Sequence, residues 1–272
     1  MTTIDASMRS VEIQGTTVPR LGFGTWQLRG RDCVEAVRDA LEIGYRHIDT
    51  ARIYRNETEV GRGLAASGVD RADIFLTTKI WPGDFERARL RAATEDSLRS
   101  LATEYIDLLL LHWPSDDLVL EDALGAMVAL RDEGKIRHLG VSNFFDGLLR
   151  QALDLAPVFT DQVELHPHLG RPKLVELALE RDFMVTAYSP LAQGKVARDG
   201  TLREIAEAHG NSTGQVALRW LLDQPNVSAI PKASSHEHRA ENFEVFDFDL
   251  TAEERARIGA RPEDRRRTDP WA

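Results

Sequence analysis

Short apolar runs alternate with longer amphipathic segments along most of the chain. The apolar runs predict eight β-strands, at residues 21–23, 47–49, 74–78, 106–111, 138–141, 159–163, 184–187 and 227–230. The segments between them predict helices, the clearest at residues 32–43, 57–66, 85–101, 120–133, 173–181 and 213–222. Strands that alternate with helices indicate a parallel sheet, and eight such repeats predict an α/β protein with the (β/α)8 TIM-barrel fold.

Two patterns predict which faces of these elements are buried. The helix at 85–101 carries small and apolar residues at i, i+3, i+4 and i+7 spacing, so we expect one buried face. Its members are Leu90, Ala93, Thr94, Ser97, Leu98 and Leu101. The strand at 106–111 is almost continuously apolar, as expected for a parallel strand covered on both sides. Residues 11–21 predict a β-hairpin that turns near Gln14 and Gly15 and caps the floor of the barrel.

A doubly wound sheet is the main alternative fold, because it shows the same alternation of strands and helices. Its phosphate-binding pattern G-x-G-x-x-G is incomplete here, since Gly22 and Gly24 are followed by Gln27 at the third glycine position. Gly61 and Gly63 lie inside a helical pattern. If a dinucleotide binds to this chain, we therefore expect it to bind by other means.

Composition narrows the class of protein. The 272 residues include 42% hydrophobic and 29% charged residues, which is ordinary for a globular chain, and we expect residues 1–272 to form a single barrel domain. The net charge of −10 opposes binding to nucleic acid or anionic membranes. No window approaches the roughly 20 apolar residues of a membrane span, so we expect a cytoplasmic protein, and by default a monomer. The single cysteine, Cys33, excludes an intrachain disulfide and is expected to pack in the core.

Polar residues follow the predicted strands at the points where they end. Asp49 closes one strand, Lys79 and His112 follow two others, and Tyr54 lies in the loop after Asp49. The carboxyl ends of barrel strands share one rim, where barrel enzymes carry their catalytic groups. Each residue alone has a structural explanation, such as a cap, a solvated charge or packing. Together they predict an acid/base site, with a phenol, a cation, a carboxylate and an imidazole.

A metal-dependent barrel hydrolase is the strongest enzymatic alternative. Its candidate ligands at predicted strand ends are His47, Asp49, His112, His166 and His168. The spacing of His47 and Asp49 is also an ordinary strand alternation, and a metal site leaves Lys79 and Tyr54 without a role. We therefore predict no metal.

A series of longer motifs runs through the chain in a fixed order. They are GYRHIDTARIYRNE at 44–57, TTKIWP at 77–82, LLLLHWP at 108–114, GVSNF at 140–144, DQVELHP at 161–167, YSPLAQGK at 188–195, IPKASS at 230–235 and AENFEVFDFDL at 240–250. In these motifs the chain resembles the aldo-keto reductase superfamily over roughly residues 8–260. Its short loop after His112 and short tail make it more similar to the bacterial 2,5-diketo-D-gluconate and methylglyoxal reductases than to the longer animal enzymes. The resemblance implies NADPH-dependent reduction of small or polar aldehydes, ketones or dicarbonyls to alcohols.

The resemblance also implies a role for each catalytic residue. Tyr54 donates a proton to the carbonyl oxygen, and His112 hydrogen-bonds and orients that oxygen. A phenol has a reference pKa of about 10 and is a poor acid near neutrality, so Lys79 is expected to stabilise the phenolate. Asp49 is expected to hold Lys79 in place.

The cofactor residues are implied in the same way. Ser142, Asn143 and Gln162 are expected to bind the carboxamide, and Tyr188 to stack on the nicotinamide ring. Near the pyrophosphate the resemblance implies Ser189, Leu191 and Lys195. At the ribose phosphate it implies Lys232, Ser234, Ser235 and His238, and near the adenine it implies Glu241 and Asn242.

The adenosine-phosphate segment departs from the family pattern at two positions. Ala233 stands where a serine is common, and His238 stands where an arginine is common. Both changes weaken a phosphate clamp, because a histidine is only partly charged near neutrality and lacks the planar fork of an arginine. Arg239 is adjacent, but one step along a helix turns it away by about 100°. NADP(H) is still expected because Lys232 remains, with NAD(H) as a secondary cofactor.

Aromatic residues predict the substrate wall. Trp26, Trp81 and Trp113 each follow a predicted strand on the catalytic rim and suit an apolar, ligand-facing surface. The arginines at 265–267 predict a solvated tail, and Trp271 is a candidate to fold over the rim. A noncatalytic, nucleotide-sensing barrel is the alternative from a different functional class.

Overall fold

Eight parallel strands form the centre of the structure, a computed structural model that describes residues 9–260 apart from the side chain of Asp146. They follow one another around the sheet in sequence order, so each strand pairs with the next strand of the chain. These strands are β3 (Phe23–Gly24), β4 (His47–Asp49), β5 (Phe75–Ile80), β6 (Ile106–Leu111), β7 (Ile136–Ser142), β8 (Val158–Glu164), β9 (Met184–Tyr188) and β10 (Val227–Ala229).

Hydrogen bonds between the first and last strands close the sheet into a barrel. The N–H of Gly22 donates to the carbonyl of Ala229 at 2.8 Å, and that of Gly24 donates to the carbonyl of Pro231 at 3.1 Å. A Cβ atom on Gly24 would lie only 2.7 Å from the carbonyl oxygen of Ile230, so this close approach requires a glycine. The predicted barrel is confirmed, and the two glycines serve its closure.

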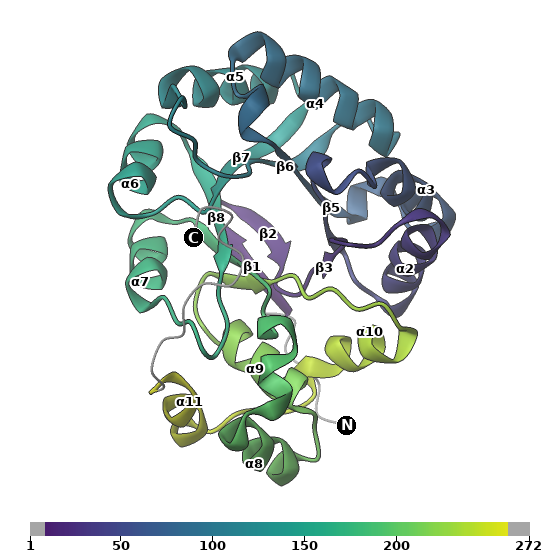
Figure 1. The fold of residues 1–272 in the computed structure, drawn as a ribbon, viewed down its shortest axis with the longest axis vertical. Coiled ribbons are helices and arrows are strands. Elements are labelled where there is room, and N and C mark those ends of the chain that lie inside the picture. Colours follow the sequence, from purple (N-terminus) through teal and green to yellow (C-terminus); the bar gives the residue numbers. More distant parts are fainter. Residues whose placement is uncertain (1–8, 261–272) are drawn as a thin grey trace.

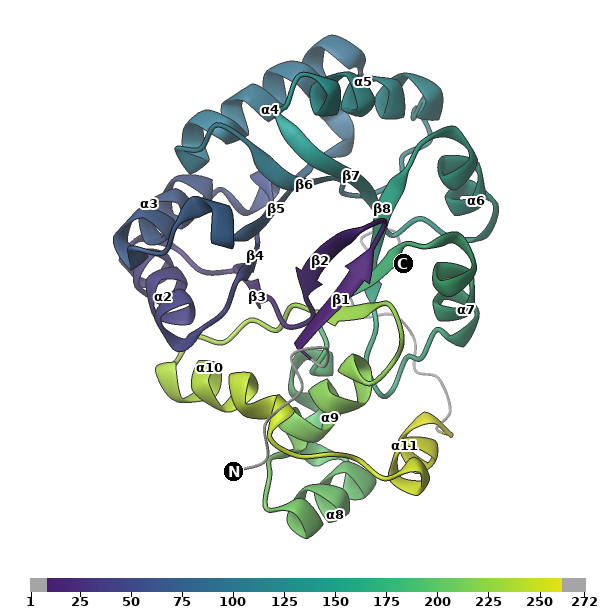
Figure 2. The same ribbon diagram turned by 180° about the vertical axis from the view of Figure 1, so that it is seen from behind.

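Helices cover the outside of the barrel, and Figures 1 and 2 show them as a ring around the strands. They are α2 (Gly30–Ile43), α3 (Glu57–Ser67), α4 (Arg87–Leu101), α5 (Leu120–Asp132), α6 (Asp146–Leu155), α7 (Pro172–Arg181), α8 (Gly200–His209), α9 (Thr213–Leu222), α10 (His236–Phe243) and α11 (Ala252–Gly259). Helices α6, α8, α10 and α11 lie outside the six that the sequence predicts most clearly. Helix α11 buries only Ile258, so apolar spacing hardly marks it.

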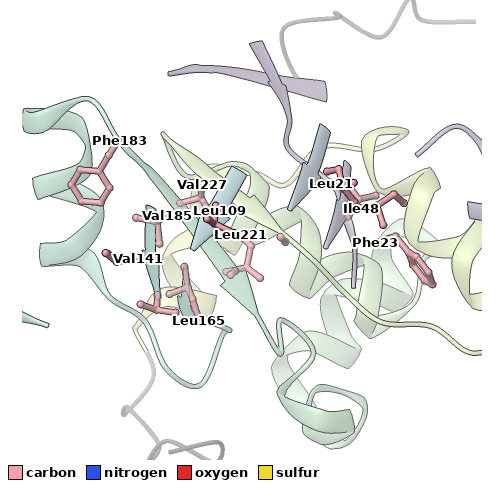
Figure 3. Packing of buried hydrophobic residues seen from close by; sticks show 14 of the residues in the cluster. Leu21, Phe23, Ile48, Leu109, Val141, Leu165, Phe183, Val185, Leu221 and Val227 are labelled. Carbon is pink, nitrogen blue, oxygen red and sulfur yellow. The ribbon is translucent and has the colours of Figure 1, made fainter. Parts of the chain in front are cut away.

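The strands are buried on both faces, as predicted for β6. Leu108 and Leu110 point into the barrel, whereas Leu109 and Leu111 belong to the cluster between strands and helices. Figure 3 shows Leu109 in this outer cluster with residues of neighbouring strands. The predicted face of α4 is also confirmed, since Leu90, Ala93, Thr94, Ser97 and Leu101 are buried, while Leu98 is partly buried against the same cluster.

A β-hairpin of β1 (Ser10–Ile13) and β2 (Thr16–Pro19) covers one end of the barrel, and Figure 2 shows it in purple across the ring. Its turn residues Gln14 and Gly15 both have positive φ angles, 48° and 75°, as in the turns that suit two-residue hairpins. The side chain of Gln14 donates to the carbonyl of Val158, the first residue of β8, at 3.1 Å. The hairpin therefore caps the barrel at the amino ends of the strands, which confirms the predicted floor.

The structure tests the predictions about Cys33 and membrane spans, and leaves those about the tail and the single domain untested. Cys33 is fully buried in the core as predicted, and burial raises the pKa of its thiol to about 12. In residues 9–260 there is no helix with the length and apolar character needed to cross a membrane. The predicted tail at 265–267 and Trp271 lie outside the described residues. That residues 1–272 form one domain stays a prediction.

Candidate active site

A cavity of about 860 Å³ lies at the carboxyl ends of the strands, opposite the hairpin. The loops that follow the strands form its wall. The predicted site residues that line it are Trp26, Asp49, Tyr54, Trp81, His112, Trp113, Ser142, Asn143, Gln162, Tyr188, Ser189, Leu191, Lys232, Ser234, His238, Glu241 and Asn242. Lys79 lies fully buried behind the wall.

A buried ion pair forms the base of this cavity. Asp49 ends β4 and Lys79 lies on the adjacent strand β5. The Nζ atom of Lys79 donates to Oδ1 of Asp49 at 2.5 Å and to the carbonyl oxygen of Thr50 at 2.8 Å. The side-chain amide of Gln162 donates to Oδ2 of Asp49 at 2.8 Å. Burial lowers the pKa of Lys79, although the charge of Asp49 opposes that shift, and the pair is neutral as a whole.

Tyr54 lies in the 3₁₀ turn η1 (Arg52–Tyr54), directly above this pair. Its ring centroid is 5.1 Å from Nζ of Lys79 and 5.8 Å from the ring centroid of His112. Burial raises the pKa of Tyr54 well above 10, and the charge of Asp49 acts in the same direction. This direction is opposite to the one expected from Lys79, and its largest cause is the burial of the phenol. The phenol therefore keeps its proton at neutral pH.

His112 follows β6 and faces the same cavity. Burial, together with the charge of Lys79, holds the pKa of His112 well below 6.5, so the imidazole is neutral. Its Nδ1 atom is buried and has no hydrogen-bond partner in the part of the chain that the structure describes. The ring of Trp81 packs edge to face against it, with centroids 5.3 Å apart. A neutral imidazole has one donor and one acceptor nitrogen, so this group can donate a hydrogen bond to a carbonyl oxygen.

A chain of hydrogen bonds connects the ends of β7, β8 and β9. The hydroxyl of Ser142 donates to the carbonyl of Gln162 at 2.8 Å, and the amide of Asn143 donates to Ser142 Oγ at 3.0 Å. The hydroxyl of Tyr188 donates to Oδ1 of Asn143 at 2.9 Å. The structure thus brings together four residues that were predicted at the nicotinamide. It also adds a contact that the sequence did not predict, between the side chain of Gln162 and Asp49.

The residues predicted at the adenosine phosphate lie around the start of α10. The Nζ atom of Lys232 donates to the hydroxyl of Ser234 at 2.8 Å, and His238 is exposed in the cavity wall. Glu241 and Asn242 line the same region.

Three neighbours of these residues do not line the cavity. Arg239 is buried and donates to Asp39 at 2.6 Å, so it points away from the cavity as predicted. The hydroxyl of Ser235 accepts a hydrogen bond from the backbone N–H of His238 at 3.3 Å and caps α10. Lys195 lies outside the lining residues, in the kinked 3₁₀ segment η4 (Ala192–Arg198).

The cavity has lining residues that the sequence did not single out. Gln27 and Arg29 follow Trp26 in the loop after β3, and Ile53 precedes Tyr54. Gln27, Arg29 and Ile53 could have been found from the sequence because they lie close along the chain to Trp26 and Tyr54, which were predicted at the rim. Further members are Gln193, Gly194, Ser212, Thr213 and Gly214, of which Ser212 could have been found from the capping box that begins α9. Trp26 and Ile53 are 44% and 42% exposed, so the mouth of the cavity is open.

The histidines considered as metal ligands have separate partners. His47 contacts the hydroxyl of Thr77 at 3.3 Å, whereas His166 contacts Glu164 at 3.3 Å and His168 contacts Asp199 at 2.8 Å. Within residues 9–260, no three His, Cys, Asp or Glu side chains gather in an arrangement that could hold a metal ion. The hydrolase alternative therefore finds no ligand cluster in this region.

Comparisons with known proteins agree with the site. The family model described as Aldo/keto reductase family matches residues 20–261. The chain is 42% identical over 243 residues to an aldo-keto reductase of Mycolicibacterium smegmatis, covering 88% of each chain. It is 36% identical to methylglyoxal reductase DkgB of Escherichia coli O157:H7, covering 89% of this chain and 92% of that one. The solved structure of a candidate 2,5-diketo-D-gluconic acid reductase B matches with a TM-score of 0.95 and 41% identity, covering 97% and 95% of the two chains. These similarities confirm the group that the motifs indicated.

Proposed function

The chain belongs to the aldo/keto reductase family, which implies NAD(P)H-dependent reduction of carbonyl groups, and we propose that Tyr54 is the general acid of this reaction. The proposed substrates are small or polar aldehydes, ketones and dicarbonyls, and the proposed cofactor is NADPH. One observation carries the proposal. A protonated phenol and a neutral imidazole, from Tyr54 and His112, face one tryptophan-lined cavity above the buried Asp49–Lys79 pair.

The residues of the cavity fit a nicotinamide dinucleotide. Hydroxyl and amide groups of Ser142, Asn143 and Gln162 gather near the catalytic residues, where they suit a carboxamide. Lys232 and Ser234 offer a cation and a hydroxyl at the region near α10, where they suit a phosphate. A reduced nicotinamide supplies the hydride when it is bound.

The chain itself supplies orientation and a proton. His112 donates a hydrogen bond to the carbonyl oxygen and thereby fixes its position beside Tyr54. As negative charge develops on that oxygen, the hydroxyl of Tyr54 donates its proton. Lys79, 5.1 Å from the ring centroid, is a cation beside the phenolate that remains. Asp49 holds Lys79 in this position and Gln162 holds Asp49, so both act as positioning residues.

Replacing Tyr54 with phenylalanine tests the assignment. Loss of general acid catalysis typically costs 10²–10⁴-fold, so we expect kcat/KM for carbonyl reduction to fall by about that factor. Cofactor affinity, followed by quenching of tryptophan fluorescence, is expected to change by less than about twofold, because the hydroxyl is not among the proposed cofactor ligands. An active Tyr54→Phe enzyme overturns the proposal. A wild-type protein that binds NADPH but reduces no carbonyl in a broad panel supports the nucleotide-sensing alternative instead.

The choice of NADPH rests on Lys232 and Ser234, and it is weakened by Ala233 and the exposed His238. Comparing kcat/KM for NADPH and NADH tests it, and a clear preference for NADH overturns it.

The monomeric state and the cytoplasmic location remain proposals from the sequence. Light scattering of the purified protein tests the first of these.

A further inference from the structure

The charges around Tyr54 do not cancel completely. Asp49 and Lys79 neutralise each other, and His112 carries no charge because its pKa lies well below 6.5. The remaining charged residue in this part of the cavity wall is Arg29. A guanidinium is always protonated, and within residues 9–260 no carboxylate forms a salt bridge with it. The catalytic end of the cavity therefore carries one unbalanced positive charge.

The side chain of Arg29 is held next to the catalytic loop. Arg29 directly precedes the first residue of α2. Its Nη1 atom donates a hydrogen bond to the carbonyl oxygen of Leu28 at 3.2 Å and another to the carbonyl oxygen of Tyr54. Its Nε and Nη2 atoms donate to no acceptor in the described chain. A guanidinium offers parallel N–H groups that match the two oxygens of a carboxylate. The group is thus both anchored and able to bind an anion.

The rest of the wall around Tyr54 is unsuited to an anion. Its large side chains are the apolar Trp26, Ile53, Trp81 and Trp113, and its uncharged polar member is Gln27. Placing a carboxylate against apolar side chains without a compensating hydrogen bond or charge is strongly unfavourable. Whether the cavity accepts an anionic substrate should therefore depend on Arg29.

We propose that Arg29 determines specificity by binding the carboxylate of carbonyl substrates that also carry an acid group. The carbonyl lies between Tyr54 and His112, and the carboxylate contacts the guanidinium of Arg29. This inference rests on the proposed carbonyl reductase function and specifies the substrate class of the same site.

A matched pair of substrates isolates the effect. The anionic member is 4-oxobutanoate, which carries a carbonyl and a carboxylate on one flexible chain, and the neutral member is its methyl ester. The quantity to measure is the ratio of kcat/KM for the acid to kcat/KM for the ester, with NADPH. Because the ratio cancels any general effect on Tyr54, it reports on recognition of the carboxylate alone.

Arg29→Gln is expected to lower this ratio about tenfold, chiefly through a higher KM for the acid, since a charge-assisted hydrogen bond is lost. Arg29→Lys should retain part of the ratio. Added salt should lower the ratio in the wild type and leave it unchanged in Arg29→Gln, because exposed charges are screened. The control is Arg55→Gln, since Arg55 is an exposed arginine one residue from Tyr54 that does not line the cavity. This control should leave the ratio unchanged.

Three results would overturn the inference. They are an unchanged ratio in Arg29→Gln, an equal loss of kcat/KM on both substrates, and a raised KM for NADPH with no change in the ratio. The equal loss would mean that Arg29 only supports the catalytic loop, and the raised cofactor KM would mean that it binds the cofactor. If the wild type reduces neither substrate nor any carbonyl in the panel, the proposed function itself fails, so the two failures are distinguishable.

Discussion

The two ends of the barrel interior are built from the same strands but have opposite character. Strand β5 places Phe75 at the floor and Lys79 near the rim, and β8 places Phe159 at the floor and Gln162 near the rim. The floor is an apolar cluster that the hairpin covers, whereas the rim holds a buried ion pair and its hydrogen bonds. Stability and chemistry thus occupy opposite ends of each strand, as expected for a barrel.

The histidines and arginines show the same contrast. At the floor, His138 stacks on Phe159 with ring centroids 4.0 Å apart, and Arg137 forms an ion pair with Asp107 at 2.9 Å. A smaller cavity of about 380 Å³ at this end is lined by Arg137 and two other arginines, Arg9 and Arg46, and all three already have partners. At the rim, His112 and Arg29 keep hydrogen-bonding atoms that no described residue uses. The arginines at the floor are occupied by the fold, whereas His112 and Arg29 at the rim remain available for a ligand.

Breaking the ion pair at the rim should have the largest effect. Lys79→Met leaves Asp49 buried without a cation, which should lower the free energy of unfolding by about 3–5 kcal/mol and abolish carbonyl reduction. Urea denaturation followed by circular dichroism measures the first effect. The double variant Asp49→Asn/Lys79→Met is the matched control, and it should regain much of the stability but none of the activity. A Lys79→Met protein with the wild-type denaturation midpoint would contradict this view of the rim.

A change at the floor should separate stability from chemistry. Phe159→Leu removes part of a fully buried side chain, so we expect a loss of about 1–2 kcal/mol in the free energy of unfolding. At a temperature where the variant remains folded, kcat/KM should stay within about twofold of the wild type, because Phe159 does not line the catalytic cavity. A large loss of kcat without a loss of stability would show that the two ends are coupled.

The smallest effect is expected from a histidine at the floor, His138, through the change of the free energy of unfolding with pH. Burial lowers the pKa of His138 below 6.5, so the unfolded chain binds a proton more readily than the folded protein does. Stability contributed by the neutral form is present above pH 6.5 and is lost as the pH falls from there towards the lowered pKa. His138→Phe should therefore reduce the fall in stability between pH 7 and pH 5 by a few tenths of a kcal/mol. Urea denaturation at both pH values measures it, and an unchanged or steeper fall would exclude this contribution.

The sequence alone determined the order of strands and the position of the rim. Continuous apolar runs marked strands buried on both faces, and the polar residues at their ends, Asp49, Lys79 and His112, followed from local pattern. Because parallel strands place their carboxyl ends at one rim, these residues meet in the structure, and Tyr54 follows in the next loop. The hairpin turn at Gln14 and Gly15 was equally local.

The tertiary structure alone decided the contacts and electrostatics of the site. Gln162 reaches Asp49 across 113 positions of sequence, and no local pattern records such a distance. The raised pKa of Tyr54 depends on its burial and on the charge of Asp49, and the unbalanced charge of Arg29 depends on which carboxylates lie nearby. Periodicity specifies which face of an element is buried, whereas desolvation and charge pairing depend on neighbours that only the folded chain brings together.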